Sequence, residues 1–166
     1  MKAVIFDRDG VLNKDRGFLG RADDLEWIAG AKRAIARLKA LGVLVIVATN
    51  QSGVGRGLFT LEDVDAVHAR MQADLAADGG RIDAFYVCPF HPEAVLACFR
   101  HADHPDRKPN PGMVQRALAD FGLDPTEAVL VGDQPRDIEA AVRAGVRGVL
   151  FEGGDLDAFL EQTIGV

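Results

Sequence analysis

Two aspartates one residue apart, Asp7 and Asp9, follow the apolar run of residues 4–6 and precede Gly10. Neighbouring carboxylates repel each other, so the pair is unfavourable unless a cation lies close to both. Taken alone, the motif also fits an ordinary solvated turn, because Asp and Gly are frequent turn residues. The other polar groups of the chain decide between these two interpretations.

Other residues suited to phosphate chemistry stand close to later apolar runs. Thr49 and Asp133 each lie at the end of such a run, and Lys108 lies in the loop after another. Three carboxylates without clustered histidines suit a hard cation, most simply Mg²⁺, while a hydroxyl and a lysine suit a phosphate. An aspartate can attack phosphorus, and a second acid can protonate the leaving oxygen and then deprotonate the attacking water. The set therefore predicts phosphoryl transfer with Asp7 and Asp9 at its centre.

The elements that must position these groups alternate between strands and helices. Five apolar runs predict strands, at residues 3–6, 43–48, 82–87, 128–131 and 146–151. Amphipathic stretches between and after them predict helices over residues 31–41, 61–77, 110–122, 134–145 and about 155–163. Most of the strands are apolar on both faces, which predicts a doubly wound, Rossmann-like parallel sheet flanked by helices, an α/β fold. We see no repeat or linker and expect one domain over residues 1–166.

This fold class predicts where the polar groups meet. In open α/β sheets, ligands bind in the crevice beyond the carboxyl ends of the strands. The polar groups named above follow strands or lie in loops that return to that edge. Their convergence from separate parts of the chain favours one site over several independent turns.

Composition narrows the classes of partner. The chain of 166 residues is 48% hydrophobic and carries a net charge of −6, which argues against general binding of nucleic acid or membranes. No apolar run approaches the ~20 residues of a membrane-spanning helix, and the first run ends at Asp7, too early for a signal peptide. The two cysteines, Cys88 and Cys98, form no disulfide framework. We expect a cytoplasmic monomer acting on a small molecule.

Four motifs together resemble those of the haloacid dehalogenase superfamily of phosphatases. They are Asp7-Arg8-Asp9-Gly10, Thr49-Asn50-Gln51-Ser52-Gly53, Arg107-Lys108-Pro109 and Gly132-Asp133. The detailed sequences of these motifs are similar to those of the subgroup that contains heptose bisphosphate phosphatases and histidinol phosphatases. The resemblance runs from Lys2 to about Phe151. It implies a Mg²⁺-dependent phosphomonoesterase that works through an aspartyl-phosphate on a small phosphorylated sugar.

The resemblance also implies a role for each matching residue. Asp7 would be the nucleophile and Asp9 the general acid/base. Mg²⁺ would be bound by Asp7, the backbone carbonyl of Asp9, and Asp133, with Asp137 behind these ligands. The phosphoryl group would be held by Thr49, Asn50 and Lys108, and the rest of the substrate by Arg107, Arg56, Gln51 and Ser52.

The lengths and residues of two loops bear on whether the fold has a cap domain and a zinc site. The loops of residues 10–29 and 88–109 are too short for a cap domain, so we expect a capless haloacid dehalogenase fold with an open site. Members of the resembling subgroup often hold a structural Zn²⁺ in the second of these loops. Here Cys88 matches, but Phe90 replaces a histidine, and His104 and Asp106 replace two cysteines. Another irregular set is formed by His91, Cys98, His101 and His104. Such sets are poor in thiolates, so we expect packing and hydrogen bonds, not zinc, to hold the loop.

Other functions remain open at this point. A phosphoreceiver domain also combines acids, a threonine and a lysine, but its phosphorylated aspartate follows the third strand, where this chain has Val87-Cys88. Histidinol phosphate and the 3′-phosphate of a nucleic acid are alternative substrates, because the motifs address the phosphate and not its leaving group. We expect His68 to be solvated on a surface helix and Trp27 to serve packing.

Overall fold

The computed structural model describes residues 1–166 and contains one five-stranded sheet in which every pairing is parallel. The strand order is β3-β2-β1-β4-β5, so the strand that precedes Asp7 lies in the middle. The strands are β1 (Ala3–Phe6), β2 (Leu44–Asn50), β3 (Ala84–Cys88), β4 (Ala128–Gly132) and β5 (Arg147–Leu150). The predicted doubly wound parallel sheet is confirmed.

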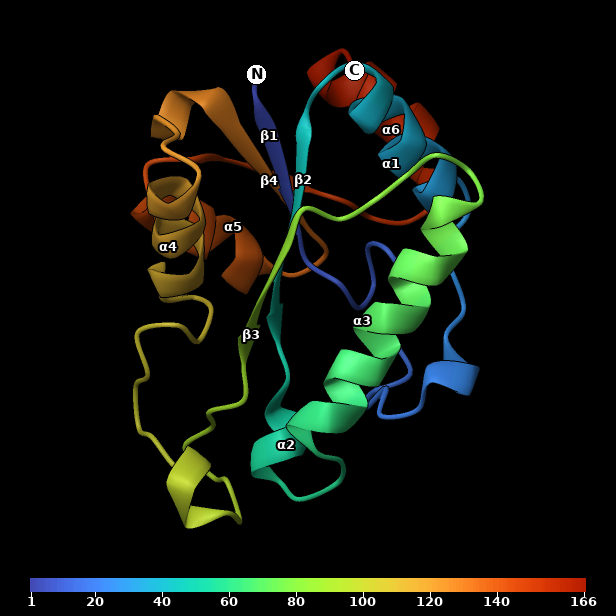
Figure 1. Cartoon of the computed structure of the whole chain (residues 1–166). Coiled ribbons are helices and arrows are strands. Elements are labelled where there is room, and N and C mark those ends of the chain that lie inside the picture. Colours follow the sequence, from blue (N-terminus) through green and yellow to red (C-terminus); the bar gives the residue numbers. More distant parts are fainter.

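Helices cover both faces of this sheet (Figure 1). They are α1 (Ala31–Ala40), α2 (Ser52–Gly55), α3 (Leu61–Ala76), α4 (Gly112–Asp120), α5 (Pro135–Arg143) and α6 (Leu156–Ile164). Helices α1, α3 and α6 pack on one face, and α4 and α5 pack on the other. None of the helices has the length and apolar character needed to cross a membrane.

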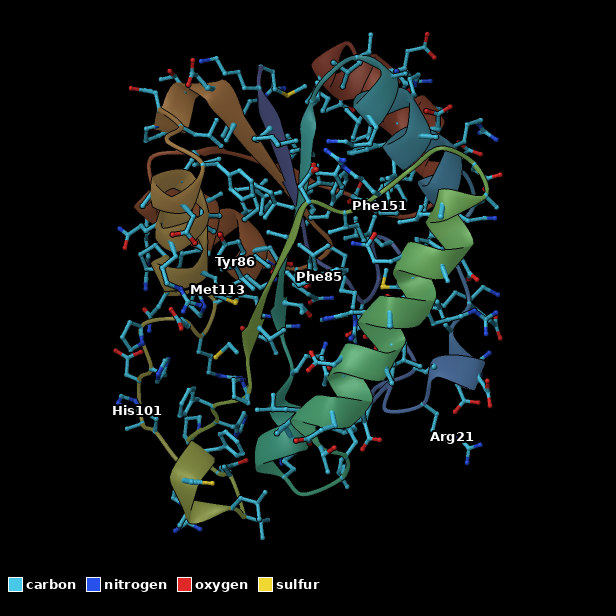
Figure 2. All side chains as sticks on the ribbon, in the orientation of Figure 1. Arg21, Phe85, Tyr86, His101, Met113 and Phe151 are labelled. Atoms are coloured by element: carbon cyan, nitrogen blue, oxygen red, sulfur yellow. The ribbon has the colours of Figure 1, made fainter.

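The alternation of side chains along the strands divides the core in two. In β1, Val4 and Phe6 point to the face covered by α1, α3 and α6, whereas Ala3 and Ile5 point to the opposite face. Figure 2 shows the same division in β3, where Phe85 and Tyr86 lie on opposite sides of the ribbon. Both faces of the central strand are therefore buried, as its uninterrupted apolar sequence predicts.

Local signals set several boundaries as expected, with some differences. Thr60 and Asp63 form a reciprocal capping box at the start of α3. The second strand extends past its predicted end and includes Thr49 and Asn50, which continue the pairing with β3. The four-residue helix α2 was not predicted, because so short a helix has no apolar period. Leu41, the last residue of the first predicted helix, is 59% exposed, and α1 ends before it.

Two long connections flank the carboxyl edge of the sheet. Residues 7–30 join β1 to α1 with one 3₁₀ turn (Ala22–Asp24), and residues 89–111 join β3 to α4 with another (Ala97–Phe99). A third 3₁₀ turn (Pro125–Glu127) precedes β4. Neither long connection contains an inserted domain, so the edge lacks a cap, as expected.

Candidate active site

Asp7 and Asp133 each follow a strand directly, Asp7 after β1 and Asp133 after β4. The backbone N–H of Asp7 donates to the carbonyl of Val131 at 2.9 Å, so the ladder between β1 and β4 continues to the first acid. Gly10 has a φ of +88°, and a Cβ there would lie 2.3 Å from Oδ2 of Asp133. A glycine is required at position 10 both by the positive φ of the backbone and by the close approach of the Asp133 carboxylate.

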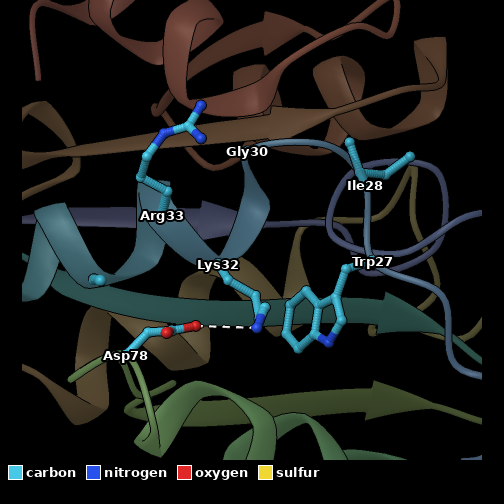
Figure 3. A pocket seen from close by; sticks show the side chains of 7 residues that line it. Trp27, Ile28, Gly30, Lys32, Arg33 and Asp78 are labelled. Atoms are coloured by element: carbon cyan, nitrogen blue, oxygen red, sulfur yellow. Dashed lines mark ion pairs between the residues drawn. The ribbon is translucent and has the colours of Figure 1, made fainter.

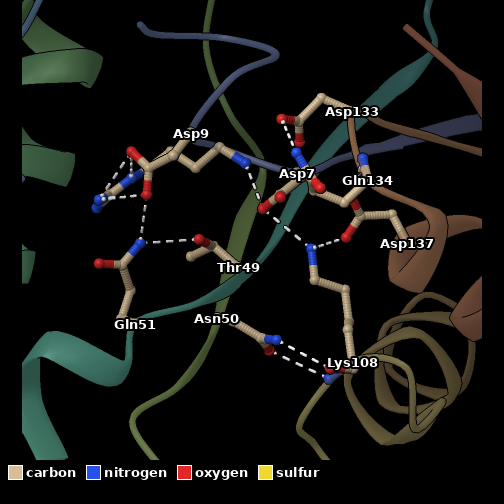
Figure 4. Close-up of polar contacts among 10 residues, drawn as sticks. Asp7, Asp9, Thr49, Asn50, Gln51, Lys108, Asp133, Gln134 and Asp137 are labelled. Carbon is tan, nitrogen blue, oxygen red and sulfur yellow. Dashed lines mark hydrogen bonds and ion pairs between the residues drawn. The ribbon is translucent and has the colours of Figure 1, made fainter. Parts of the chain in front are cut away.

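Three carboxylates form a compact cluster of oxygen ligands. Asp7, Asp133 and Asp137 each offer an oxygen within 4.8 Å of the others. Oδ1 of Asp133 is buried without a hydrogen-bond partner, while its Oδ2 accepts from Nε2 of Gln134 at 2.9 Å (Figure 4). A buried, unpartnered carboxylate oxygen among three acids fits a hard divalent cation such as Mg²⁺. Asp137, predicted to stand behind the ligands of Mg²⁺, contributes a carboxylate oxygen to this cluster.

One lysine joins two members of the cluster. The ammonium group of Lys108, only 1% exposed, lies 2.9 Å from Asp7 and 2.7 Å from Asp137. Burial alone would lower the pKa of Lys108, but the charges of the two aspartates outweigh it and raise that pKa. Burial raises the pKa of Asp7 to about 6, against the opposing effect of Lys108. The cluster therefore brings three carboxylates and one cation together, a charge imbalance that a divalent cation relieves.

Two close contacts hold this cluster in place. The N–H of Lys108 donates to Oδ1 of Asn50 at 3.1 Å, and Nδ2 of Asn50 donates to the carbonyl of Lys108 at 3.0 Å. A Cβ at Gly132 would lie 2.2 Å from Cβ of Asp137, so only glycine lets α5 approach the end of β4 so closely. The strand ends thus fix Lys108 and Asp137 from two directions.

Asp9 faces a different set of groups. Its carboxylate accepts hydrogen bonds from Arg8, from Nδ2 of Asn13 at 2.8 Å and from Nε2 of Gln51 at 2.8 Å. The same Gln51 nitrogen lies 2.9 Å from Oγ1 of Thr49. Burial would raise the pKa of Asp9, but the charge of Arg8 and these hydrogen bonds outweigh it and hold the pKa below its ordinary value. The Asp9 side chain is not part of the carboxylate cluster.

The expectation for His68 is wrong. Its side chain is 6% exposed and stacks on Phe85 with ring centroids 4.0 Å apart. It lies in the buried stripe of α3, whose members are Val64, Val67, His68, Met71 and Leu75. This stripe has the helical period, so the position of His68 could have been found in the sequence. Arg8, for which no separate role was predicted, is fully buried beside it.

A small polar cavity opens beside the carboxylates, with a volume of about 110 Å³. It has no hydrophobic lining residue and is bounded by Asp7, Asp9, Asp15, Gly17, Asn50, Ser52, Arg107, Asp133 and Arg136. Ser52 and Arg107, which were predicted to bind the substrate, line this cavity, whereas Gln51 does not. Arg56 does not line it, and instead lies 3.2 Å from Nε2 of His91 and 3.6 Å from Glu93.

Arg136 was missed by the sequence analysis. It lies in the first turn of α5, and the N-terminal ends of helices that follow parallel strands face the carboxyl edge, which could have indicated it. Burial, with a smaller effect from the charge of Arg136, lowers the pKa of Arg107. The Arg107 guanidinium donates only to the carbonyl of Phe90, at 3.1 Å. Neither arginine has a carboxylate partner.

The loop between β3 and Lys108, in which the irregular cysteine and histidine set lies, is packed by aromatic rings. Phe90 stacks on His104 with centroids 3.7 Å apart and meets Phe99 and His101 edge-on. Nδ1 of His104 accepts a hydrogen bond from the N–H of Asp106 at 3.1 Å. Cys88 is a buried free thiol, and burial raises its pKa.

A larger cavity lies away from the strand ends, beside α1 (Figure 3). It has a volume of about 500 Å³ and is lined by Trp27, Ile28, Gly30, Lys32, Arg33, Ala36 and Asp78. Its cations are already paired, Lys32 with Asp78 at 3.0 Å and Arg33 with Asp155 at 2.8 Å. Trp27 packs against the core, as expected. Asp7, Asp9 and Asp133 line only the smaller cavity, and Lys108 lies behind it in contact with Asp7.

Comparisons with known proteins agree with the chemistry of this edge. A family model described as HAD-hydrolase-like matches residues 106–162. The D-glycero-β-D-manno-heptose-1,7-bisphosphate 7-phosphatase of Rhodopseudomonas palustris is 42% identical, over 98% of this chain and 89% of that protein. The D-glycero-D-manno-heptose-1,7-bisphosphate 7-phosphatase of Thermosynechococcus vestitus is 41% identical, over 97% and 84%.

A solved structure extends these similarities to the fold. The D,D-heptose 1,7-bisphosphate phosphatase of B. bronchiseptica, complexed with magnesium and phosphate, aligns with a TM-score of 0.81 and 39% identity, over 98% of this chain and 87% of that one. The chain belongs to the haloacid dehalogenase superfamily and is a phosphatase, a hydrolase of phosphoric monoesters. Within that superfamily, its similarity runs at nearly full length to the heptose bisphosphate phosphatases.

Proposed function

We propose that this phosphatase removes the 7-phosphate from D-glycero-D-manno-heptose 1,7-bisphosphate. The observation that carries the proposal is the 42% identity, over 98% of the chain, to a phosphatase named for that substrate. The site supports it, because Arg107 and Arg136 border the catalytic cavity without a carboxylate partner. Two guanidinium groups at the rim suit a substrate with a second anionic group.

The first chemical step would form a bond between Asp7 and phosphorus. An oxygen of Asp7 attacks the phosphoryl group, and the bond from phosphorus to the sugar oxygen breaks. The charge of the bound phosphate would raise the pKa of Asp9 against the effect of Arg8, so that Asp9 enters the step protonated and gives its proton to the sugar oxygen. Asp7, Asp133 and Asp137 would hold Mg²⁺, which would supply positive charge against the phosphate and the acids. Lys108 adds a second cation at the same edge.

The second step would release the phosphate. A water molecule attacks the phosphorus of the aspartyl-phosphate, and Asp9, now deprotonated, takes a proton from that water. The bond between phosphorus and the Asp7 oxygen breaks, which regenerates the carboxylate and frees inorganic phosphate. Thr49 and Asn50 would hold the transferring group together with Lys108, and Ser52 and Gln51 would border the substrate. Arg56 would reach the substrate only by leaving His91.

The proposal includes several further points. We propose that residues 1–166 act as one catalytic domain, as a monomer, in the cytoplasm, where the free thiols of Cys88 and Cys98 remain reduced. We also propose that the enzyme needs no zinc, because Phe90 and His104 stack face to face where metal ligands would have to converge. Elemental analysis of the purified protein tests the last point, and stoichiometric zinc would contradict it.

A panel of substrates tests the function. Initial rates are measured for both anomers of the heptose 1,7-bisphosphate, for histidinol phosphate and for a DNA end carrying a 3′-phosphate. We expect the highest kcat/KM for a heptose bisphosphate, with the 1-phosphate retained in the product by ³¹P NMR. A higher kcat/KM for histidinol phosphate would assign the enzyme to that reaction instead. The net charge of −6 and the absence of a basic stripe disfavour the DNA substrate.

The role of Asp9 has its own test. Asp9→Asn should lower kcat severely for an alkyl phosphate, whose leaving oxygen needs a proton, and less for p-nitrophenyl phosphate, whose leaving group needs little protonation. The ratio of the two losses is the measurement. Equal losses on both substrates would argue that Asp9 is not the general acid.

A further inference from the structure

Both oxygens of the Asp9 carboxylate accept hydrogen bonds from protein groups. Oδ1 accepts from Nε of Arg8 at 3.2 Å and from Nδ2 of Asn13 at 2.8 Å. Oδ2 accepts from Nη2 of Arg8 at 3.0 Å and from Gln51 at 2.8 Å (Figure 4). Because a guanidinium presents its N–H groups in a fixed plane, these contacts determine the orientation of the carboxylate.

Arg8 is in turn held by His68. Nη1 of Arg8 lies 3.3 Å from Nε2 of His68. A guanidinium has donors only, so Nε2 must accept, and the ring must be neutral with its proton on Nδ1. Burial, and then the charge of Arg8, lower the pKa of His68 to about 3, which agrees with a neutral ring. The imidazole is itself fixed by stacking on Phe85, at an interplanar angle of 12°.

Stability alone does not account for this arrangement. Arg8 is 0% exposed, and removing a guanidinium from water offsets much of what its partners contribute. Apolar side chains of similar volume often serve a core equally well or better. The buried charge is in contact with only one acid, Asp9, and with one imidazole. What the pair provides beyond stability is a fixed direction for the Asp9 carboxylate.

We propose that Arg8 and His68 are positioning residues that orient the Asp9 carboxylate for its proton transfers. The inference rests on the proposed function, in which Asp9 gives a proton to the leaving oxygen and later takes one from water. Arg8 acts by direct contact with Asp9, and His68 acts through Arg8, three residues from the core residue Met71 on the same helix. Neither side chain lines the catalytic cavity, so neither touches the substrate.

Kinetics with two leaving groups test the inference. For His68→Leu, which removes the acceptor, we expect kcat to fall about 10-fold more with an alkyl phosphate than with p-nitrophenyl phosphate, since general acid catalysis contributes about 10²–10⁴-fold when fully in place. His68→Gln, which restores an acceptor, should recover most of this selective loss. Met71→Leu, a volume-conserving change in the same buried stripe, should leave the ratio unchanged. An equal loss on both substrates in His68→Leu would overturn the inference.

A double-mutant comparison separates this inference from the proposed function. In an Asp9→Asn background, His68→Leu should cause no further leaving-group selectivity, because the group it positions is gone. Additive selectivity would overturn the inference. If Asp9→Asn alone shows no selectivity, the proposed role of Asp9 has failed and the positioning role fails with it. If Asp9→Asn is selective and His68→Leu is not, only the positioning role fails.

A spectroscopic measurement keeps the inference testable if a variant does not fold. The ¹⁵N shifts of the His68 ring in the wild-type protein should show the neutral form protonated at Nδ1, with Nε2 as acceptor. Arg8→Met should shift the Nε2 resonance, because its donor is lost. A protonated ring, or a neutral ring with its proton on Nε2, would show that His68 does not hold Arg8.

Discussion

The carboxyl edge of the sheet and the loop between β3 and Lys108 meet at the catalytic cavity but are held by different forces. We call residues 89–107 the aromatic loop. At the edge, Lys108 is buried between Asp7 and Asp137 at 2.9 and 2.7 Å. In the aromatic loop, Phe90 stacks on His104, and only a backbone carbonyl holds Arg107. The groups proposed for the chemistry are thus fixed by charge, and the residue proposed for substrate choice is carried by ring packing.

This difference determines how each region should respond to change. Removing one partner of a buried ion pair leaves an uncompensated charge, at a cost of about 3–5 kcal/mol. Contacts between aromatic rings are worth less, about 0.5–1.5 kcal/mol beyond the area they bury. Substitutions at the edge should therefore lower the turnover of every substrate. Substitutions in the aromatic loop should change which substrates are used, and by how much.

Asp7→Asn gives the largest expected effect. The amide retains the shape of the side chain but is not a nucleophile, so kcat should fall below a few per cent of wild type for every phosphate ester. The fold should persist, because the change removes a charge from a cluster that has an excess of acids. Steady-state rates measure the loss of turnover, and circular dichroism measures whether the variant is folded. Substantial turnover by a folded Asp7→Asn protein would contradict the assignment of the nucleophile.

Metal removal should have a comparable effect that can be reversed. EDTA should abolish hydrolysis of p-nitrophenyl phosphate, and added Mg²⁺ alone should restore it, because three carboxylates converge within 4.8 Å with one lysine as their cation. Asp133→Asn should raise the Mg²⁺ concentration needed for half-maximal rate. As a matched control, Asp15→Asn removes an acid that lines the same cavity but lies outside the cluster, and should leave that concentration unchanged. Full activity in EDTA would rule out the metal's role.

The edge was more predictable from the sequence than its surroundings. Asp7, Thr49 and Asp133 stand directly after or at the ends of apolar strands, and parallel strands bring their carboxyl ends together by topology alone. The alternation of side chains along a strand does not continue into the turn after it. The sequence therefore could not show that the Asp9 side chain turns away from the carboxylate cluster toward Arg8.

Residues outside the strand ends depend on contacts between distant segments. Arg136 is brought to the cavity by the direction of α5, and Arg56 is held away from it by His91. His68 is a different case, because it stands in the helical period of the buried positions of α3, which is visible in the sequence. Its polar side chain led to the prediction that it is solvated. The ring stack of Phe90 on His104 joins residues fourteen positions apart in an irregular loop, for which no period exists.

Arg107→Ala should separate the two regions most clearly. If the substrate is a heptose bisphosphate, kcat/KM should fall by about 10–100-fold, as the loss of one charge-assisted contact of ~1.5–3 kcal/mol would cause. The rate with p-nitrophenyl phosphate, which has no second phosphate, should scarcely change. Arg100→Ala is a matched control, since its guanidinium donates to loop carbonyls and does not line the cavity. Equal losses on both substrates would place Arg107 in the catalytic machinery.

Phe90→Ala should give the smallest effect and show what the ring stack contributes. The substitution removes the contact with His104 but keeps the backbone carbonyl that accepts from Arg107. For a half-buried phenyl ring we expect a loss of about 2 kcal/mol in the free energy of unfolding, and a melting temperature lower by roughly 4–8 °C. Val95→Ala, at a 70% exposed position in the same loop, should not shift the melting temperature. Because the loop carries Arg107, kcat/KM for the bisphosphate should fall a few-fold in Phe90→Ala while the rate with p-nitrophenyl phosphate is unchanged. A proportional fall on both substrates would mean that the ring stack supports the carboxyl edge itself, and the two regions would then not be separable.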